Sequence, residues 1–383
     1  MSAPPFFRSR WVSAPDGIDE LDASELAPGF RAAGVESGIK RTGLDLGLMV
    51  CDEAGVSSAA VFTRNAAAAA PVRVTRERST LGGLRAILAN SGNANAATGA
   101  EGVADARAMQ EQAGDLLELE PATVGVASTG VIGVPLPMKS VAAGAIAADA
   151  ELSRAGGAAF SEAIMTTDNA PKRCSLRGGG VALSAQAKGA GMIEPGFATM
   201  LCFVQTDALV PDPEPLLRSA LASSFERITV DGQLSTNDSV FLQASGTAGK
   251  PLPPELLDAV LSQLAIDVLA DGEGATRVAR LGLSGAADSD EAERVARTIA
   301  NSQLVQTALF GRDPNWGRIV QAAGMALAGE EVELAANNVD ATELGEDRSE
   351  VEIQVDLGRG GAGATVFFSD LTPGYVGLNA EYS

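Results

Sequence analysis

The sequence predicts a mixed α/β (α+β) fold in which strands and helices alternate along the chain. Short apolar runs bounded by glycine or polar turns recur across its 383 residues, and stretches with the i, i+3, i+4 spacing of packed helices lie between them. A hydrophobic content of 46% is enough for a large core. Neither an internal repeat nor a long low-complexity linker divides the chain, so we expect one large domain or two closely packed ones.

The first half of the chain carries several apolar strand patterns and three helical patterns. Strands are expected within residues 45–63, 85–90, 122–127 and 181–187. Helices are expected over residues 103–117 and 139–150, and a third helix should end near Ile164 and Met165. Polar loops rich in glycine, asparagine or threonine follow some of these elements, at residues 90–99, 128–133 and 166–172.

The second half continues the alternation. The apolar run 200–204 predicts a buried strand, and a helix is expected within 213–225, opening at Pro215. Another helix is expected over 254–269, and Asp288 with Glu291 three residues later is typical of a helix start. Val351, Ile353 and Val355 alternate with polar residues, which indicates a half-exposed strand. The acidic segment 330–356 is expected to be a solvated surface.

The charge and the cysteines limit the classes of partner. The chain has 28 Lys and Arg against 49 Asp and Glu, and its net charge of −21 repels phosphate backbones and anionic lipids. We therefore expect neither nucleic acid nor a membrane as a partner. The longest uncharged run, 121–138, is broken by prolines and glycines and predicts no membrane span. Cys51, Cys174 and Cys202 are odd in number and widely spaced, which favours buried thiols in a reducing cytoplasm over disulfides or a metal site.

The chain contains no histidine, and this absence restricts its chemistry. Ser-His-Asp triads, Cys-His pairs and histidine-ligated metals are excluded. Acyl transfer could still use a Ser-Lys pair, a carboxylate base, or a nucleophile whose own α-amine is freed by cleavage just before it. The last option has the best base, since an α-amine titrates near ~7.7–8.0 and an unperturbed lysine near ~10.4.

The stretch from Lys188 to Leu201 is a glycine-rich approach that ends at Thr199 and runs into an apolar strand. The Thr199 hydroxyl could attack the carbonyl of Ala198, and the glycines permit the backbone angles that such an attack requires. Taken alone, however, the pattern also fits an ordinary glycine loop between two strands.

The residues Lys188-Gly189-x-Gly191-Met192-Ile193-x-Pro195 followed by Ala198-Thr199-Met200-Leu201 resemble the signature of the ornithine acetyltransferases of arginine biosynthesis, also called glutamate N-acetyltransferases. Further stretches match that family in the right order: 29–40, 61–63, 90–99, 128–133, 165–172, 227–238, 271–276 and 310–318. The similarity extends over roughly residues 29 to 382.

The resemblance implies that the chain cleaves itself between Ala198 and Thr199, giving fragments 1–198 and 199–383 that interleave as one functional unit. Thr199 would then take the acetyl group from N2-acetyl-L-ornithine as an ester and pass it to L-glutamate in a ping-pong cycle. By the same resemblance Thr129 and Gly130 form the oxyanion hole. The substrate-contacting positions would be Thr166, Lys188, Thr199, Glu273 and Asn379.

The resemblance also implies a layered helix/sheet sandwich of the N-terminal-nucleophile type and an assembly of two cleaved pairs, a heterotetramer. No cofactor and no metal are expected, while the residues leave open whether acetyl-CoA serves as a co-substrate. Two alternatives remain. An amidase or aminopeptidase with an N-terminal nucleophile would share the self-cleavage, and a binding or structural protein would keep the fold without maturing.

Overall fold

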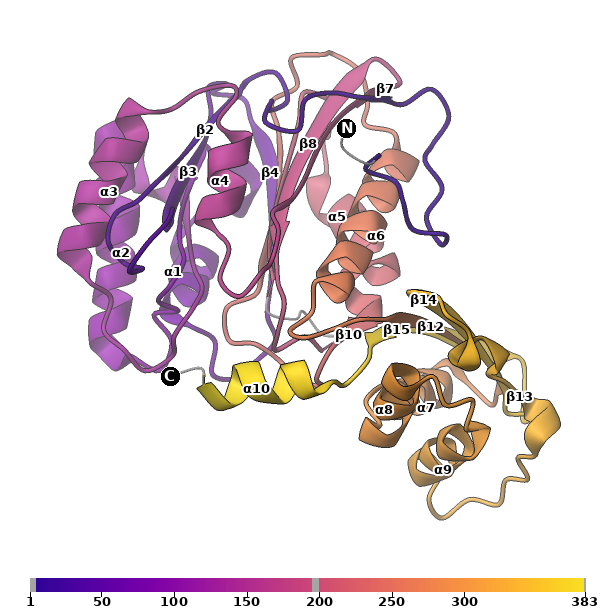
Figure 1. Ribbon diagram of the computed structural model, residues 1–383. Coiled ribbons are helices and arrows are strands. Elements are labelled where there is room, and N and C mark those ends of the chain that lie inside the picture. Colours follow the sequence, from indigo (N-terminus) through magenta and orange to yellow (C-terminus); the bar gives the residue numbers. More distant parts are fainter. Residues whose placement is uncertain (1–4, 195–199, 382–383) are drawn as a thin grey trace.

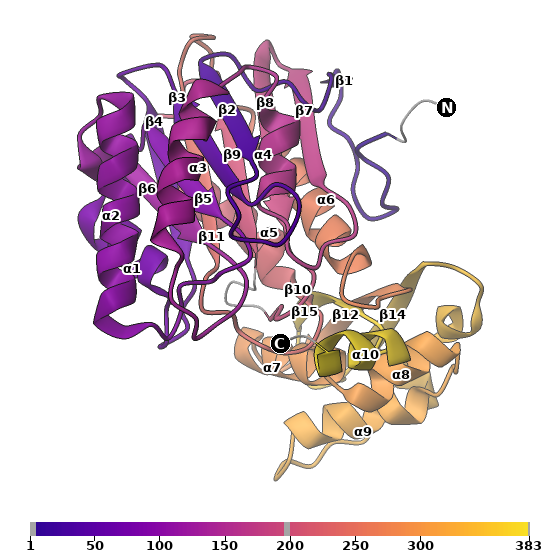
Figure 2. The same ribbon diagram turned by 60° about the vertical axis from the view of Figure 1, so that its left-hand side comes forward.

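A computed structural model describes residues 5–194 and 200–381. The chain forms a larger lobe with two stacked sheets and a smaller lobe with a third sheet and its own helices (Figures 1 and 2). The predicted nucleophile Thr199 and its predecessor Ala198 lie outside the described residues.

The central sheet of the larger lobe has six strands. Their order is β1 (Asp19–Glu20), β7 (Lys172–Gly178), β8 (Val181–Lys188), β9 (Leu201–Thr206), β11 (Ser239–Ala244) and β4 (Ser57–Phe62). Strands β8 and β9 are antiparallel neighbours in the middle of this sheet, and Lys188 pairs with Leu201. Strands from before and after the predicted cleavage site are therefore adjacent in one sheet.

The second sheet of the larger lobe has four strands. They are, in order, β2 (Phe30–Val35), β3 (Leu46–Cys51), β5 (Ala86–Asn90) and β6 (Val124–Ser128). Its inner face packs on the six-stranded sheet through an apolar layer that includes Met49, Ile87 and Phe203. Strands β5 and β6 are parallel, so the residues after each lie at the same edge of the sheet.

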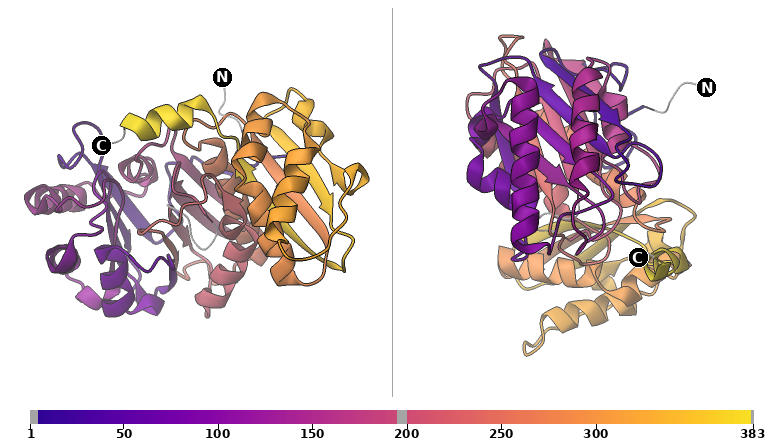
Figure 3. Two further views of the ribbon diagram at one scale, coloured as in Figure 1. Left: turned by 90° about the horizontal axis from the view of Figure 1, so that it is seen from below. Right: turned by 90° about the vertical axis from the view of Figure 1, so that its left-hand side faces the viewer.

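Helices cover both outer faces of the two sheets, giving the layered sandwich visible in Figure 3. Helices α1 (Ala70–Arg78), α2 (Gly99–Leu117) and α3 (Met138–Ala150) lie against the four-stranded sheet. Helices α5 (Pro213–Ser223) and α6 (Pro254–Ala270) lie against the six-stranded sheet. The short helix α4 (Gly157–Ala163) contributes the buried Phe160 to the layer between the sheets. The predicted mixed α/β sandwich is confirmed.

The smaller lobe packs three helices on a five-stranded sheet. The strand order is β10 (Ile228–Thr229), β15 (Ala362–Ser369), β12 (Val278–Ala286), β14 (Glu350–Asp356) and β13 (Val339–Asp340). The helices are α7 (Ser289–Ala300), α8 (Gln303–Gly311) and α9 (Trp316–Ala326). From this lobe the last helix, α10 (Pro373–Glu381), runs back along the lower edge of the larger lobe in the view of Figure 1.

Five short 3-10 helices complete the described secondary structure: η1 (Leu81–Gly83), η2 (Pro121–Thr123), η3 (Phe225–Arg227), η4 (Ala336–Asn338) and η5 (Thr342–Gly345). Within residues 5–194 and 200–381, no helix is long and apolar enough to cross a membrane.

Most predicted element boundaries agree with the structure within a few residues. The Asp288 side chain accepts a hydrogen bond of 2.8 Å from the Glu291 N–H at the start of α7, so the predicted helix start is confirmed. The predicted opening of α5 at Pro215 is wrong, because the helix begins at Pro213. A proline is tolerated anywhere in the first helical turn, so two prolines there leave the first residue undetermined. All three cysteines are buried and free, as predicted.

Candidate functional site

The centre of the candidate site is a contact between Lys188 and Thr129. Lys188 is the last residue of β8, and alternation along this strand turns its side chain away from the α5–α6 face and toward the four-stranded sheet. Its Nζ donates a hydrogen bond of 2.9 Å to Thr129 Oγ1, and the two residues are only 1% and 2% exposed. Burial lowers the pKa of Lys188, and the nearby charge of Lys172 adds to this effect against the opposing pull of Asp168, Asp238 and Glu273.

Thr129 and Gly130 follow β6 directly. The Gly130 φ angle is +133°, and a Cβ at this residue would lie 2.3 Å from the carbonyl carbon of Gly92, so the position requires glycine. Among the described residues, the Gly130 N–H donates to no acceptor, whereas the flanking Thr129 and Val131 N–H groups bond to Asn90 and Gly92. Lys188 donates to the Thr129 oxygen, so the hydrogen of the Thr129 hydroxyl can be donated to another group. The Gly130 N–H has no acceptor in the described part of the chain, and both groups can therefore donate to an incoming oxygen.

A buried ion cluster lies beside this pair. The Lys172 Nζ is 2.7 Å from Asp168 Oδ1 and 2.6 Å from Asp271 Oδ2. Asp168 also accepts hydrogen bonds from the N–H groups of Gly189 and Thr166. Burial alone would raise the pKa of Asp168, but Lys172 and Lys188, together with these bonds, hold it at about 2. The cluster fixes the loop that carries Thr166 against the residue that follows Lys188.

Glu273 lies against the glycine-rich stretch after Lys188 and against the loop that carries Thr166. Its Oε1 accepts a hydrogen bond of 2.9 Å from Thr167 Oγ1, and its Oε2 accepts one of 2.7 Å from Asn379 Nδ2 on α10. The Glu273 N–H also bonds to the carbonyl of Ala190 at 2.8 Å. A Cβ on Gly191 would lie 2.6 Å from the Glu273 carboxyl carbon, so the absence of a side chain at residue 191 lets the carboxylate approach.

Asp238 supports the start of β9. Its Oδ1 accepts a hydrogen bond of 3.0 Å from the N–H of Met200, the residue that follows Thr199 in the sequence. Asp238 is fully buried, and its Oδ2 has no hydrogen-bond partner among the described residues. Burial raises the pKa of Asp238 well above its usual range, although the Met200 N–H and Lys188 oppose the rise. Burial therefore favours the protonated form of a carboxyl that bonds to Met200, the first described residue after the predicted cleavage site.

The structure brings all six described candidate residues into one region. Lys188 contacts Thr129, Gly130 follows Thr129, and Glu273 contacts Asn379. Thr166 joins the group through Asp168, not through a direct contact with Lys188 or Glu273. The roles predicted for these residues stay predictions, as do those of Ala198 and Thr199, which lie outside the described residues.

The sequence reasoning did not single out Asp168, Lys172, Asp271 or Asp238 as site residues. Each lies within a stretch that matched the family, so the signal was present, but nothing local distinguishes it from a solvated charge. Their importance comes from burial, which a sequence window does not reveal. In the described part of the chain, no three His, Cys, Asp or Glu residues gather closely enough to hold a metal ion.

The fold and the site together define a class of protein, a layered α/β enzyme with hydroxyl, amide and buried lysine groups arranged around the start of a central strand. The ArgJ family model matches residues 31–383. The arginine biosynthesis bifunctional protein ArgJ of Symbiobacterium thermophilum is 43% identical over 402 residues, which cover 95% of this chain and 100% of that protein. The protein of the same name from Thermobifida fusca is 42% identical, and the match covers 94% of this chain and 100% of that protein.

Among solved structures, ornithine acetyltransferase from Mycobacterium tuberculosis, complexed with ornithine, is 42% identical with a TM-score of 0.45, and the match covers 46% of this chain and 98% of that one. The family model and the relatives place the chain in the ArgJ family. It is therefore an acetyltransferase of arginine biosynthesis, and the predicted family and enzyme class are confirmed.

Proposed function

We propose that this enzyme transfers the acetyl group of N2-acetyl-L-ornithine to L-glutamate, producing L-ornithine and N-acetyl-L-glutamate. The observation that carries this proposal is the buried contact of 2.9 Å between Lys188 Nζ and Thr129 Oγ1, at the end of the strand that pairs with the start of β9. A chain cut before Thr199 would begin one residue ahead of Met200, next to this contact.

The first step is self-cleavage between Ala198 and Thr199. The Thr199 hydroxyl oxygen attacks the carbonyl carbon of Ala198, and the peptide C–N bond breaks, which leaves an ester and a free α-amine on Thr199. Water then hydrolyses the ester, releasing the Ala198 carboxylate and restoring the hydroxyl. We assign the Asp238 carboxyl a supporting role in this step, since burial raises its pKa and favours the protonated form, which could donate to the departing amine.

Acetyl transfer then proceeds in two half-reactions. The Thr199 α-amine accepts the hydroxyl proton while the oxygen attacks the acetyl carbonyl of acetyl-ornithine, and the C–N bond breaks as ornithine leaves with a proton. The amine of glutamate next attacks the acetyl-Thr199 ester, and the Thr199 oxygen leaves and recovers its proton. The net change is the exchange of one amide bond for another.

The developing negative charge on the acetyl oxygen needs donors in each half-reaction. The Thr129 O–H and the Gly130 N–H are free for this purpose, and burial makes such donors stronger than they would be in water. The loss of one donor in an oxyanion hole typically costs about 2.7–4 kcal/mol of barrier. The positive end of Lys188 beside Thr129 adds to the favourable potential for an anion.

The substrates carry charges of both signs, and the site offers groups for each. We assign the δ-ammonium of acetyl-ornithine to Glu273, whose carboxylate is presented between Thr167 and Asn379. The α-carboxylate would lie toward Lys188 and Thr166. Because Asn379 donates to Glu273 from α10, the C-terminal helix holds this carboxylate in place.

The remaining features of the proposal are coarser. We propose that the two fragments stay together, because β8 and β9 of the central sheet belong to different fragments. We also propose that two cleaved pairs assemble, as the family resemblance implies. Three buried thiols suit an enzyme of a reducing cytoplasm. We also propose that no cofactor is needed, with acetyl-CoA as the second acetyl donor to be tested.

The acetyl-transfer experiment uses purified protein and acetyl-ornithine with or without glutamate. With glutamate present, ornithine and N-acetylglutamate should form together over many turnovers. Without glutamate, ornithine release should stop after the first half-reaction, at no more than one equivalent per enzyme. Release of acetate at the same rate with and without glutamate would instead indicate an amidase. Acetyl-CoA can replace acetyl-ornithine in a parallel reaction, and N-acetylglutamate formed there would make the enzyme bifunctional.

A further inference from the structure

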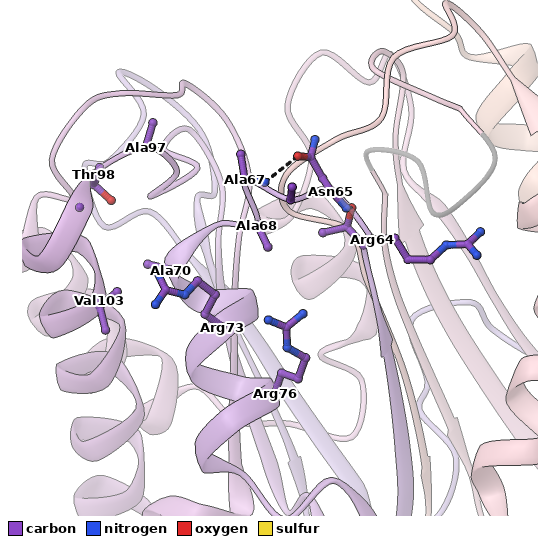
Figure 4. A pocket seen from close by; sticks show the side chains of 13 residues that line it. Arg64, Asn65, Ala67, Ala68, Ala70, Arg73, Arg76, Ala97, Thr98 and Val103 are labelled. Atoms are coloured by element: carbon purple, nitrogen blue, oxygen red, sulfur yellow. Dashed lines mark hydrogen bonds between the residues drawn. The ribbon is translucent and has the colours of Figure 1, made fainter.

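A cavity of about 520 Å³ lies on the side of the larger lobe between the end of β4 and the N-terminal ends of α1 and α2. Its walls come from residues 63–68, from α1 and from the loop before α2 (Figure 4). None of the six candidate site residues that the structure describes lines it. The volume is within the range of about 300–1,000 Å³ that small-molecule sites occupy.

Among the described residues, three arginines and no carboxylate line this cavity. They are Arg64, just after β4, and Arg73 and Arg76, one helical turn apart on α1. Figure 4 shows the Arg73 and Arg76 side chains extending from α1 at the cavity. In a chain with a net charge of −21, three cations without a lining acid form an exceptional local excess of positive charge.

These cations lack strong partners in the described part of the chain. Arg64 and Arg73 form no ion pair there, and Arg76 reaches only its exposed neighbour Glu77, at 3.9 Å. Helix α1 carries no acidic residue in its first turn, although that end of a helix favours negative charge. An anion in the cavity would therefore be attracted by the Arg73 and Arg76 guanidinium groups and by the N-terminal end of α1.

An adjoining hollow offers a comparison, because arginines and carboxylates of the protein line it together. It shares Thr63, Arg64 and Arg76 with the cavity but is also lined by Asp212, Glu214 and Glu226. There Arg218 is paired with Glu214 at 2.9 Å. Within the residues that the structure describes, none of these carboxylates forms an ion pair with the shared Arg64 or Arg76, and Arg73 lines only the first cavity. These arginines therefore remain able to bind a ligand from outside.

The cavity is built on the same backbone as the candidate site. The Thr63 N–H donates to the Asp238 carbonyl at 3.0 Å, and Thr63 Oγ1 donates to the Ser235 carbonyl at 2.7 Å. The Asn65 side chain bonds to the Leu234 carbonyl. The wall of the cavity is thus fixed by the segment that also carries Asp238.

We propose that this cavity binds a phosphate-bearing small molecule of about nucleotide size, with Arg73 and Arg76 as the phosphate ligands and Arg64 at the rim. Guanidinium groups bind phosphate through paired N–H donors, which an ammonium cannot reproduce. A long nucleic acid is not the ligand, because the rest of the acidic surface would repel it. The proposal is independent of the acetyl-transfer reaction.

Isothermal titration calorimetry of the purified protein tests the proposal with four probes: pyrophosphate, ADP, coenzyme A and adenosine. ADP should bind at one saturable site, and adenosine, which lacks phosphate, should not. Replacement of Arg73 and Arg76 by alanine together should weaken ADP binding at least about 100-fold. Arg73→Lys, which keeps the charge but loses the fork of donors, should weaken it by an intermediate factor.

Arg107→Ala is the matched control, since Arg107 is an exposed arginine of α2 that does not line the cavity. It should change ADP affinity by less than about twofold. Equal affinity of ADP and coenzyme A supports a free nucleotide as the ligand, and much tighter binding of coenzyme A supports the phosphate-bearing tail of an acyl thioester. The proposal is overturned if ADP does not bind, if the double variant binds ADP as tightly as the wild type, or if Arg107→Ala weakens binding as much as the double variant. Thermal unfolding of each variant checks that it is folded.

Discussion

Replacement of Lys172 by methionine should destabilise the larger lobe strongly. The Lys172 side chain is 4% exposed, and its Nζ lies 2.7 Å from Asp168 and 2.6 Å from Asp271. Methionine has a similar length, so the substitution fills the same space but removes the only cation that contacts both carboxylates in the described structure. Asp168 would keep its two backbone donors yet lose its closest positive charge.

The magnitude follows from the cost of leaving one member of a buried ion pair without its partner, about 3–5 kcal/mol. The Asp271 side chain is 16% exposed, so water can partly solvate its charge, whereas the Asp168 side chain has no exposed surface. We therefore expect a loss of about 3 kcal/mol in the free energy of unfolding. Urea unfolding at pH 7, followed by both circular dichroism and tryptophan fluorescence, measures it.

Arg218→Met provides the comparison. Arg218 pairs with Glu214 at 2.9 Å as well, but both side chains are more than half exposed, so this change should cost less than about 1 kcal/mol. Combining Lys172→Met with Asp168→Asn should restore part of the lost stability, because the second change removes the uncompensated charge. A loss below about 1 kcal/mol for Lys172→Met would refute the assignment of a buried, mutually dependent cluster.

Three further predictions concern pH, the oxyanion hole and the Glu273 carboxylate. The pKa of Asp168 is about 2 in the folded state against an ordinary value of 3.8, so its carboxylate stabilises the folded state by about 2 kcal/mol above pH 4. Unfolding measured over a series of acid pH values should show that this contribution is lost as the pH falls toward 2. The contribution should be missing in Asp168→Asn. Thr129→Ala should lower kcat about 100- to 1,000-fold with little change in KM, whereas Thr129→Ser should retain most activity; equal kcat for the two variants would contradict the hydroxyl's role. Gly191→Ala should raise KM for acetyl-ornithine, since its Cβ would lie 2.6 Å from the Glu273 carboxyl carbon, while Gly55→Ala, with open space around it, should leave KM unchanged.

Sequence patterns were sufficient where a segment's burial follows a simple period. The alternation at Val351, Ile353 and Val355 is the burial pattern of β14, in which these three side chains face the core. Helices α2, α3 and α6 and strands β8 and β9 were likewise predicted close to their bounds. In each of these, local propensity and tertiary packing favour the same structure.

Other elements have no hydrophobic period from which their secondary structure could be predicted. Strand β15 begins in the glycine-rich run 360–363 and is paired by β10 and β12, so its conformation depends on distant partners. Helix α10 buries none of its residues, and side-chain hydrogen bonds from Tyr375 to Asp231 and from Asn379 to Glu273 hold it in place. No window of the sequence contains the information that fixes such segments.

Some residues of the candidate site could likewise be identified from the sequence, and others could not. Lys188, Thr129 and Glu273 were identified through the family resemblance, and the structure then brought them into one region. Asp168 lies in the irregular segment before β7 and Lys172 is the first residue of that strand, so their spacing of four residues does not imply contact. Lys172 also pairs with Asp271, which is 99 residues from it in sequence. A sequence without an alignment cannot reveal a contact of this kind.

The central claim is that Thr199 becomes the N-terminal residue of a second fragment. Intact mass spectrometry of the freshly purified protein, with N-terminal sequencing of each species, tests it most directly. The account predicts two species, 1–198 and 199–383, with threonine as the first residue of the second, and a single uncut chain for Thr199→Ala. A wild-type chain that stays whole, or one that is cut at another bond, would contradict the account.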